Sequence, residues 1–269
     1  MSSQTRTLEI AEDTVIACTD EGSGPVIVLL HGHAYDRSMW NAQIPALVEA
    51  GWRVIAPDLR GFGDSSVTPG IVYTEEFSDD LEALLQRLGI ERAVVLGFSM
   101  AGQVAMEFAA QHGERLRGLV ICDTVPEAED LAGRRRRNVG ADGILSDGME
   151  AYAEKVLGAM VSQQTIDERP EAAEAVRRMI AEAPADGSAA AMRGRADRRD
   201  FTELLPAVEI PALVVVGSED AFDGGAGARM AAALPQGRLI TIPGVGHTPP
   251  MEAPEEFTAA LLGFLDGLA

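Results

Sequence analysis

A serine at a sharp turn between a strand and a helix is the residue best suited to chemistry in this sequence. The segment Val94–Gly102 reads Val-Val-Leu-Gly-Phe-Ser-Met-Ala-Gly, so an apolar strand ends before Ser99 and a helix begins after it. Small residues at Gly97 and Ala101 allow the two backbones to approach closely, and the turn lifts the hydroxyl above the sheet. We therefore predict Ser99 as a nucleophile, against the simpler alternative of a helix-capping serine.

Two loops supply a base and an acid for this nucleophile. His247 ends a Gly-Val-Gly-His sequence after an apolar strand, a context that suits a general base. Asp220 follows another buried strand, where its carboxylate could accept a hydrogen bond from the imidazole and stabilise the imidazolium. Asp123, directly after the strand that ends at Cys122, is the competing acid. We favour Asp220, because Ser, Asp, His is the chain order expected for this type of triad.

The loop after the strand Pro25–Leu30 is the expected source of an oxyanion hole. It begins His31-Gly32-His33, and the glycine lets the loop bend close to the serine turn. The backbone N–H groups of His33 and Met100 could then hold a developing oxyanion together. We expect the side chain of His31 to fix the loop, and that of His33 to shape the pocket.

The elements that must position these residues alternate between strands and helices. A hairpin is expected around Ala11–Asp13, and short apolar runs without alternation predict further strands that are buried on both faces of a parallel sheet. These runs are Pro25–Leu30, Trp52–Ala56, Ala93–Leu96, Gly118–Cys122, Ala212–Val216 and Arg238–Ile242. Helical segments are predicted at Met39–Ala50, Phe77–Leu88, Met100–Gln111 and Pro254–Leu268. The pattern predicts an α/β fold with a mostly parallel, eight-stranded sheet flanked by helices.

The alternation breaks between Pro126 and Pro206, where the sequence carries helical patterns and no convincing strand. Met149–Met160 and Glu171–Ala183 are the clearest of these helices. Because the stretch exceeds ordinary connection lengths, we predict a helical cap at residues 126–205, inserted in a core domain made of residues 1–125 and 206–269. The alternative is a set of extra helices that flank one sheet.

Composition limits the partners of this chain. Its 269 residues carry a formal net charge of −20, which repels nucleic acid and anionic membrane surfaces. Cys18 and Cys122 lie in apolar segments, so we expect two buried thiols and neither a disulfide framework nor a metal cluster. The polar segment Met1–Ile10 lacks the apolar core of a signal peptide, and no apolar run approaches the roughly 20 residues that cross a bilayer. We expect a cytoplasmic protein and leave homo-oligomerisation open.

The predicted cap begins with a basic run, Arg134–Arg137. Arginine binds planar anions through two parallel hydrogen bonds, so the run could recognise a substrate carboxylate or phosphate. We favour a solvated helix face, because charge runs on helices are mostly exposed. Trp40 and Met160 are predicted to line the substrate pocket.

Together these motifs resemble the α/β-hydrolase superfamily over essentially the whole chain. The similarity covers His31-Gly32, Trp40, Pro57–Ser65, the turn at Ser99, Gly217–Asp220 and Gly244–His247. Within the superfamily, the pattern is similar to the capped esterases and lactonases, a branch that includes 3-oxoadipate enol-lactonase, aclacinomycin methylesterase and the cofactor-free perhydrolases. The resemblance implies Ser99, Asp220 and His247 as the triad and the N–H groups of His33 and Met100 as the oxyanion hole. The resemblance also implies that the reaction requires neither a metal ion nor an organic cofactor.

The predicted function is hydrolysis of a carboxylic ester or lactone of a small molecule through an acyl-enzyme. Serine at position 99 argues against the dehalogenase and epoxide-hydrolase branches, which use aspartate there. Two alternatives stay open: the same triad used for carbon–carbon bond hydrolysis or perhydrolysis, and a hydrolase-fold protein that binds a ligand without catalysis. The sequence does not identify the physiological substrate.

Overall fold

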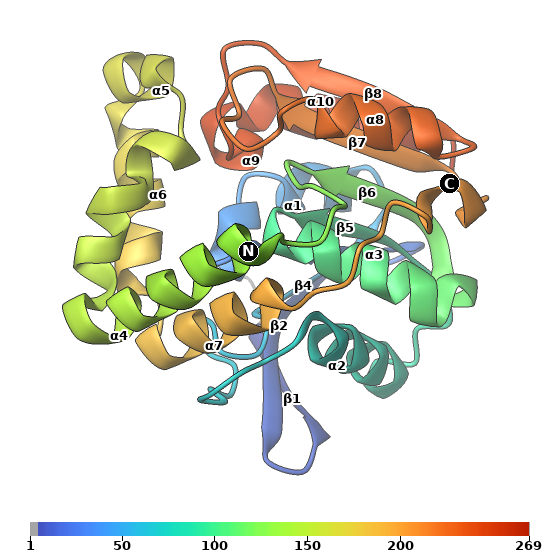
Figure 1. Cartoon of the computed structure of the whole chain (residues 1–269). Coiled ribbons are helices and arrows are strands. Elements are labelled where there is room, and N and C mark those ends of the chain that lie inside the picture. Colours follow the sequence, from blue (N-terminus) through green and yellow to red (C-terminus); the bar gives the residue numbers. More distant parts are fainter. Residues whose placement is uncertain (1–4, 269) are drawn as a thin grey trace.

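An eight-stranded sheet forms the centre of the computed structural model, which describes residues 5–268 (Figure 1). The start of the Met1–Ile10 segment therefore lies outside the described residues. The strands are β1 (Thr5–Ala11), β2 (Thr14–Glu21), β3 (Val26–Leu30), β4 (Arg53–Pro57), β5 (Ala93–Phe98), β6 (Leu116–Cys122), β7 (Ala212–Gly217) and β8 (Gly237–Ile242). Their order is β1-β2-β4-β3-β5-β6-β7-β8. Only the β1–β2 and β2–β4 pairs are antiparallel, which confirms the predicted fold class.

The parallel strands end at nearly the same level of the sheet. In the ladder, Leu30 at the end of β3 pairs with Gly97, Phe98 at the end of β5 pairs with Cys122, and Cys122 pairs with Val215. The loops that follow β3, β5, β6, β7 and β8 therefore meet at one edge of the sheet. Open α/β sheets bind their ligands at this carboxyl edge.

Helices cover both faces of the sheet, because alternate residues of each buried strand point to opposite sides. On one face pack α2 (Thr74–Arg87), α3 (Met100–His112) and α8 (Ala226–Ala233); on the other pack α1 (Ile44–Glu49) and α10 (Pro254–Leu265). The short helix α9 (Pro249–Glu252) leads into α10. Three 3₁₀ turns lie at Arg37–Trp40, Gly113–Arg115 and Leu205–Ala207.

The predicted helix Met39–Ala50 is wrong in its first half. The structure has a 3₁₀ turn at Arg37–Trp40 and starts α1 only at Ile44. Pro45 explains the break, since proline has no N–H and is tolerated only in the first turn of a helix. A helix running from Met39 would have placed this proline in its interior.

Four helices fill the connection between β6 and β7 and lie together beside the sheet (Figure 1). They are α4 (Leu131–Met160), α5 (Gln163–Glu168), α6 (Pro170–Glu182) and α7 (Ala185–Ala196), and we call them the cap helices. A non-helical Gly148, with φ of 86°, kinks α4. The division of the chain into a core domain and an inserted cap domain stays a prediction. None of the helices in residues 5–268 is long and apolar enough to cross a membrane.

Helix α7 packs on the core through two glycines. A Cβ atom on Gly187 would lie 1.9 Å from the carbonyl oxygen of Gly61, and one on Gly194 would lie 1.8 Å from that of Val72. Both distances are far below van der Waals contact, so only glycine permits this backbone-to-backbone approach. The amide of Val72 also donates to the carbonyl oxygen of Ala190, at 3.2 Å. Seven residues separate the glycines, which places them on one face of the helix.

Candidate active site

Ser99 occupies a strained turn between β5 and α3. Its φ of 52° and ψ of −112° lie in a region that residues other than glycine rarely adopt. A Cβ atom on Gly97 would lie 2.0 Å from the carbonyl oxygen of Ala101, so the turn requires glycine at that position. The Ser99 amide donates to the carbonyl oxygen of Cys122 at 2.8 Å, which anchors the turn to the neighbouring strand.

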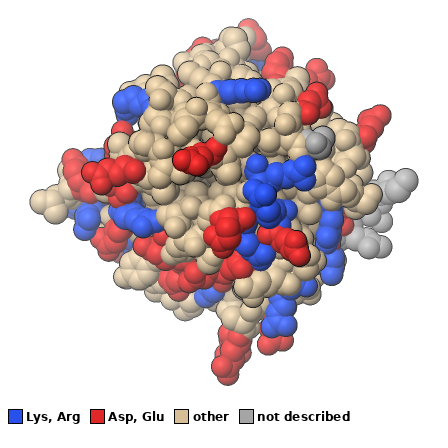
Figure 2. All heavy atoms as spheres, turned by 90° about the vertical axis from the view of Figure 1, so that its right-hand side faces the viewer, with Lys and Arg blue, Asp and Glu red and all other residues tan. Residues whose placement is uncertain are grey.

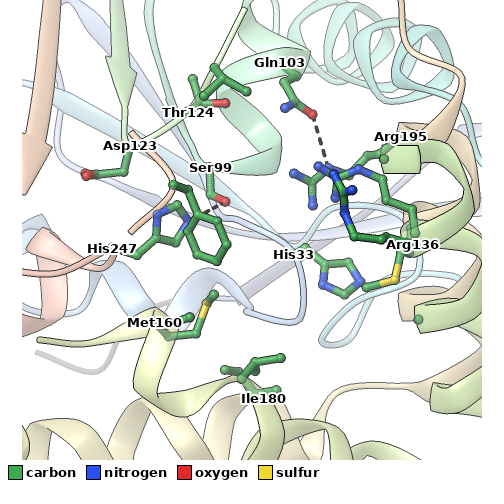
Figure 3. Close-up of a pocket in the computed structure, with 18 of the residues that line it drawn as sticks. His33, Ser99, Gln103, Asp123, Thr124, Arg136, Met160, Ile180, Arg195 and His247 are labelled. Atoms are coloured by element: carbon green, nitrogen blue, oxygen red, sulfur yellow. Dashed lines mark hydrogen bonds between the residues drawn. The ribbon is translucent and has the colours of Figure 1, made fainter. Parts of the chain in front are cut away.

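The structure brings Ser99, His247 and Asp220 into one chain of hydrogen bonds. Nε2 of His247 lies 2.8 Å from Oγ of Ser99 (Figure 3), and Nδ1 lies 3.0 Å from Oδ1 of Asp220. A carboxylate can only accept, so Nδ1 carries the proton and Nε2 is free to take the hydroxyl proton. The histidine ring also contacts Phe98 and Phe222, at centroid distances of 5.3 and 4.8 Å. These aromatic contacts hold the imidazole in place.

The two candidate acids differ in their surroundings. Burial alone would raise the pKa of Asp220, but the hydrogen bond and the charge of His247 outweigh it and hold that pKa below its usual value. Burial, and then the nearby charge of Asp220, raise the pKa of Asp123 well above its usual value. The carboxyl of Asp123 accepts the amide of Gly217 at 2.8 Å, an amide at the end of β7. These opposite shifts favour Asp220 over Asp123 as the charged partner of the imidazole, and Asp123 ties two strand ends together.

Ligand atoms of Asp123, Asp220 and His247 lie within 4.8 Å of one another, the kind of cluster that could hold a metal ion in the described part of the chain. However, Nδ1 of His247 already binds Asp220. Oδ1 of Asp123 is likewise occupied, because it accepts the amide of Gly217. The arrangement therefore suits proton transfer better than metal binding.

The loop after β3 contacts the serine turn. A Cβ atom on Gly32 would lie 2.9 Å from the Phe98 ring and 3.2 Å from Cβ of Ser99. Within residues 5–268, the amides of His33 and Met100 donate to no protein acceptor. Two free N–H donors thus flank Ser99, and that of Met100 lies at the N-terminus of α3, where negative charge is favoured.

The two histidines of this loop are neutral. Nε2 of His31 accepts the amide of Leu59 at 2.9 Å, so Nδ1 carries the proton and donates to the carbonyl oxygen of Gly32 at 2.8 Å. Burial lowers the pKa of His31. Burial, and then Arg195, lower the pKa of His33 to about 3. Nε2 of His33 lies 2.9 Å from the carbonyl oxygen of Ser188 on α7, so this ring also ties the loop to the cap helices.

A cavity of about 600 Å³ opens above Ser99, between the sheet edge and the cap helices. Ser99, His247 and His33 line its core side. The cap helices contribute both apolar and basic side chains: Arg136, Arg137, Tyr152, Lys155, Val156, Ala159, Met160, Ile180, Met192 and Arg195. The cavity is large enough for a small organic substrate.

Of the two residues predicted to line the substrate pocket, Met160 and Trp40, only one lines the cavity. Met160 lines the cavity, as expected. Trp40 does not: its side chain is fully buried, and its ring packs against Phe257 of α10 at a centroid distance of 6.2 Å. The prediction for Trp40 is wrong because the 3₁₀ turn that carries it faces the core between the sheet and α10. Sequence reasoning missed Arg195 and Gln103, because nothing in their spacing distinguishes them from other polar helix residues.

The chain matches the model of the α/β-hydrolase-fold family over residues 25–254. It belongs to this family. Among solved structures, it is similar to a thermophilic esterase from Thermogutta terrifontis with malate bound, at a TM-score of 0.94 and 38% identity over 99% of both chains. It is also similar to the enol-lactonase from Burkholderia xenovorans LB400, at a TM-score of 0.87 and 27% identity over 94% of this chain and 97% of the other.

A curated relative shares only part of its length with this chain. Bifunctional epoxide hydrolase 2 from Rattus norvegicus is 41% identical over 105 residues, which are 38% of this chain and 19% of that protein. The shared segment thus spans about a fifth of that relative. The family match and the two full-length structures confirm the predicted resemblance to α/β-hydrolase esterases and lactonases.

Proposed function

We propose that this protein hydrolyses a carboxylic ester or lactone of a small molecule. Ser99 is the nucleophile, His247 the general base and Asp220 the supporting acid. The hydrogen-bond chain from Ser99 through His247 to Asp220, with distances of 2.8 and 3.0 Å, is the observation that carries the proposal. The similarity to a solved esterase and a solved enol-lactonase supports the type of bond.

Acylation follows from the placement of these groups. Nε2 of His247 takes the Ser99 proton as Oγ attacks the carbonyl carbon. The tetrahedral oxyanion accepts hydrogen bonds from the amides of His33 and Met100. The imidazolium, stabilised by ionised Asp220, then protonates the departing alcohol and leaves an acyl group on Ser99.

Deacylation uses the same groups in the reverse order. His247 removes a proton from water, which attacks the acyl-enzyme, and the proton returns to Ser99 as the acid leaves. Every proton in this cycle is held by His247, Ser99, substrate or water. The proposed reaction therefore needs neither a metal ion nor an organic cofactor.

The test is hydrolysis of p-nitrophenyl esters from acetate to decanoate, beside a panel of small lactones. Ser99→Ala should lower kcat by about 10³- to 10⁶-fold, because the oxyanion donors and substrate binding alone retain only a residual acceleration of about 10³- to 10⁴-fold over water. Ser146→Ala is the matched control, since Ser146 is exposed on α4 and does not line the cavity. Full activity in Ser99→Ala would contradict the mechanism. A wild-type protein with no turnover and no labelling by a fluorophosphonate would instead be a ligand-binding member of the family.

A further inference from the structure

Arg195 carries a partly buried guanidinium that has no carboxylate partner within the described residues. It lies on α7 and lines the cavity, and its Nε donates to Oε1 of Gln103 at 3.1 Å (Figure 3). Within residues 5–268 it forms no ion pair with a carboxylate. Burial, and then the charges of Arg137 and Arg198, lower its pKa well below the usual value. Holding a charge in this environment costs free energy, which an incoming anion would offset.

The same wall of the cavity carries other basic groups. Arg136 and Lys155 line it, and neither makes an ion pair with a carboxylate in the described part of the chain. Arg137 differs, because it pairs with Glu129 at 2.5 Å. More basic than acidic side chains therefore line the cavity. Elsewhere in the molecule, basic side chains often form ion pairs with carboxylates.

This concentration of unpaired positive charge runs against the composition of the chain. The sequence has 42 acidic and only 22 basic residues, so carboxylates are abundant. On the face away from the cap helices, basic side chains are interspersed with acidic ones (Figure 2). Three basic side chains at the cavity wall, those of Arg136, Lys155 and Arg195, thus lack a carboxylate partner within residues 5–268 although the chain is rich in carboxylates.

The position of Arg195 indicates which part of a substrate it meets. Gln103, its hydrogen-bond partner, follows Ser99 by one turn of α3, a rise of about 6 Å for four residues. Figure 3 shows Arg195 and Arg136 on the side of Ser99 away from His247. The leaving alcohol must lie beside His247 to receive its proton, so the acyl group extends toward Arg195.

We propose that Arg195, assisted by Arg136, binds a carboxylate at the far end of the acyl group. The substrate is then a half-ester of a short dicarboxylic acid, or a lactone that carries a carboxylate in the same place. Arginine suits this task because its planar guanidinium matches a carboxylate with two parallel hydrogen bonds. The inference rests on the proposed ester hydrolysis and names the charge of its substrate.

The experiment compares two methyl esters of nearly equal shape, monomethyl glutarate and methyl 5-methylhexanoate, which differ in the terminal charge. Wild type should have the higher kcat/KM for monomethyl glutarate. Arg195→Met should reduce the ratio of the two kcat/KM values by about 10- to 100-fold, the usual effect of losing a hydrogen bond to a charged group. Arg195→Lys should recover part of the ratio. Arg136→Gln should reduce it by only a few-fold, because its side chain is exposed.

Arg134→Gln is the matched control from the same basic run. Arg134 is exposed, pairs with Asp197 at 3.1 Å and does not line the cavity, so its variant should keep the wild-type ratio. The inference is wrong if the ratio of the two kcat/KM values is near one in wild type and is unchanged in Arg195→Met and Arg136→Gln. Turnover that depends on Ser99 would still support the proposed ester hydrolysis in that case. If Arg195→Met fails to fold, the ratio in Arg136→Gln decides in the same way.

Calorimetric titration with glutarate separates the inference from the proposed catalysis. Should neither ester be hydrolysed, the proposed function fails for these substrates, yet the carboxylate site can still be measured. Glutarate that binds wild type and Ser99→Ala, and binds Arg195→Met at least about tenfold more weakly, supports the site. Equal binding to all three proteins, or none to wild type, overturns it.

Discussion

The two walls of the cavity are built in different ways. On the core wall, Ser99 and His247 line the cavity, and hydrogen bonds join them to Asp220; all three residues lie on loops that directly follow parallel strands. On the wall of cap helices, Arg195 and Arg136 come from the two helices α7 and α4, and neither is tied to the catalytic groups. The proposed catalytic groups are thus held at the edge of the sheet, whereas the proposed carboxylate-binding groups are held by the packing of helices.

The difference has a physical cause. Strand register places the core wall, and register is specified over many paired residues. Helix α7 instead meets the core through the close contacts of Gly187 and Gly194. A change in those few contacts would move the basic wall without disturbing the sheet edge.

The largest expected effect distinguishes the two acids of the core wall. Asp220→Asn should lower kcat by about 10⁴-fold, since an amide disfavours the required tautomer of His247. Asp123→Asn should cost far less, because its side-chain oxygen can still accept the amide of Gly217. Both are measured as kcat on the best ester found. A larger loss in Asp123→Asn than in Asp220→Asn would reverse the assignment of the acid.

A smaller effect is expected where α7 meets the core. Gly194→Ala places a Cβ atom 1.8 Å from the carbonyl oxygen of Val72 and should lower the free energy of unfolding by about 1–3 kcal/mol. It should also weaken the preference for the anionic ester, while Ser99 still reacts with a fluorophosphonate. Gly143→Ala is the control, because a Cβ atom at Gly143 meets nothing within 4 Å. Equal stability of the two variants in urea unfolding would show that α7 is not held by this contact.

The smallest effect concerns the proton on Asp123. Its pKa is raised in the folded protein, so between the unfolded value of about 3.9 and the folded value the native state holds more protons than the unfolded state. Wild type should therefore lose stability relative to Asp123→Asn as the pH rises, by at most about 1.4 kcal/mol per pH unit. Urea unfolding of both proteins at pH 5 and pH 6 measures the difference. A difference in the free energy of unfolding between the two proteins that is the same at pH 5 and pH 6 would mean that Asp123 is ionised in the native state over this range.

Much of the fold could be predicted because its signals are local. Unbroken apolar runs predicted the buried strands β3 to β7, and the Gly-Phe-Ser-Met-Ala sequence predicted the turn at Ser99, where Gly97 leaves room for the carbonyl oxygen of Ala101. The prediction that Arg238–Ile242 is buried on both faces is wrong, because β8 is the edge strand of the sheet and is largely exposed. The helix error at Met39–Ala50 had a local signal as well. Pro45 was visible in the sequence, and its missing N–H decides where α1 begins.

The pocket could be predicted only in part. Met160 and Trp40 were both predicted to line the pocket, but the structure places Met160 at the cavity and Trp40 between the sheet and α10. Helical periodicity indicates that a face is buried, but it does not indicate what covers that face. For the same reason the run Arg134–Arg137 looked uniform, although Arg134 pairs with Asp197, Arg137 pairs with Glu129, and Arg136 lines the cavity.

The sequence by itself determined that a serine, an acid and a histidine meet at one edge of the sheet, because each follows a strand, and parallel strands deliver their next residues to the same edge. Tertiary structure decided which acid serves the histidine, since Asp123 and Asp220 both reach that edge and only their surroundings set their charge. It also decided the charge of the pocket. Arg195 faces the cavity because Gly187 and Gly194 let α7 lie directly on the core backbone, a contact between segments that are far apart in the chain.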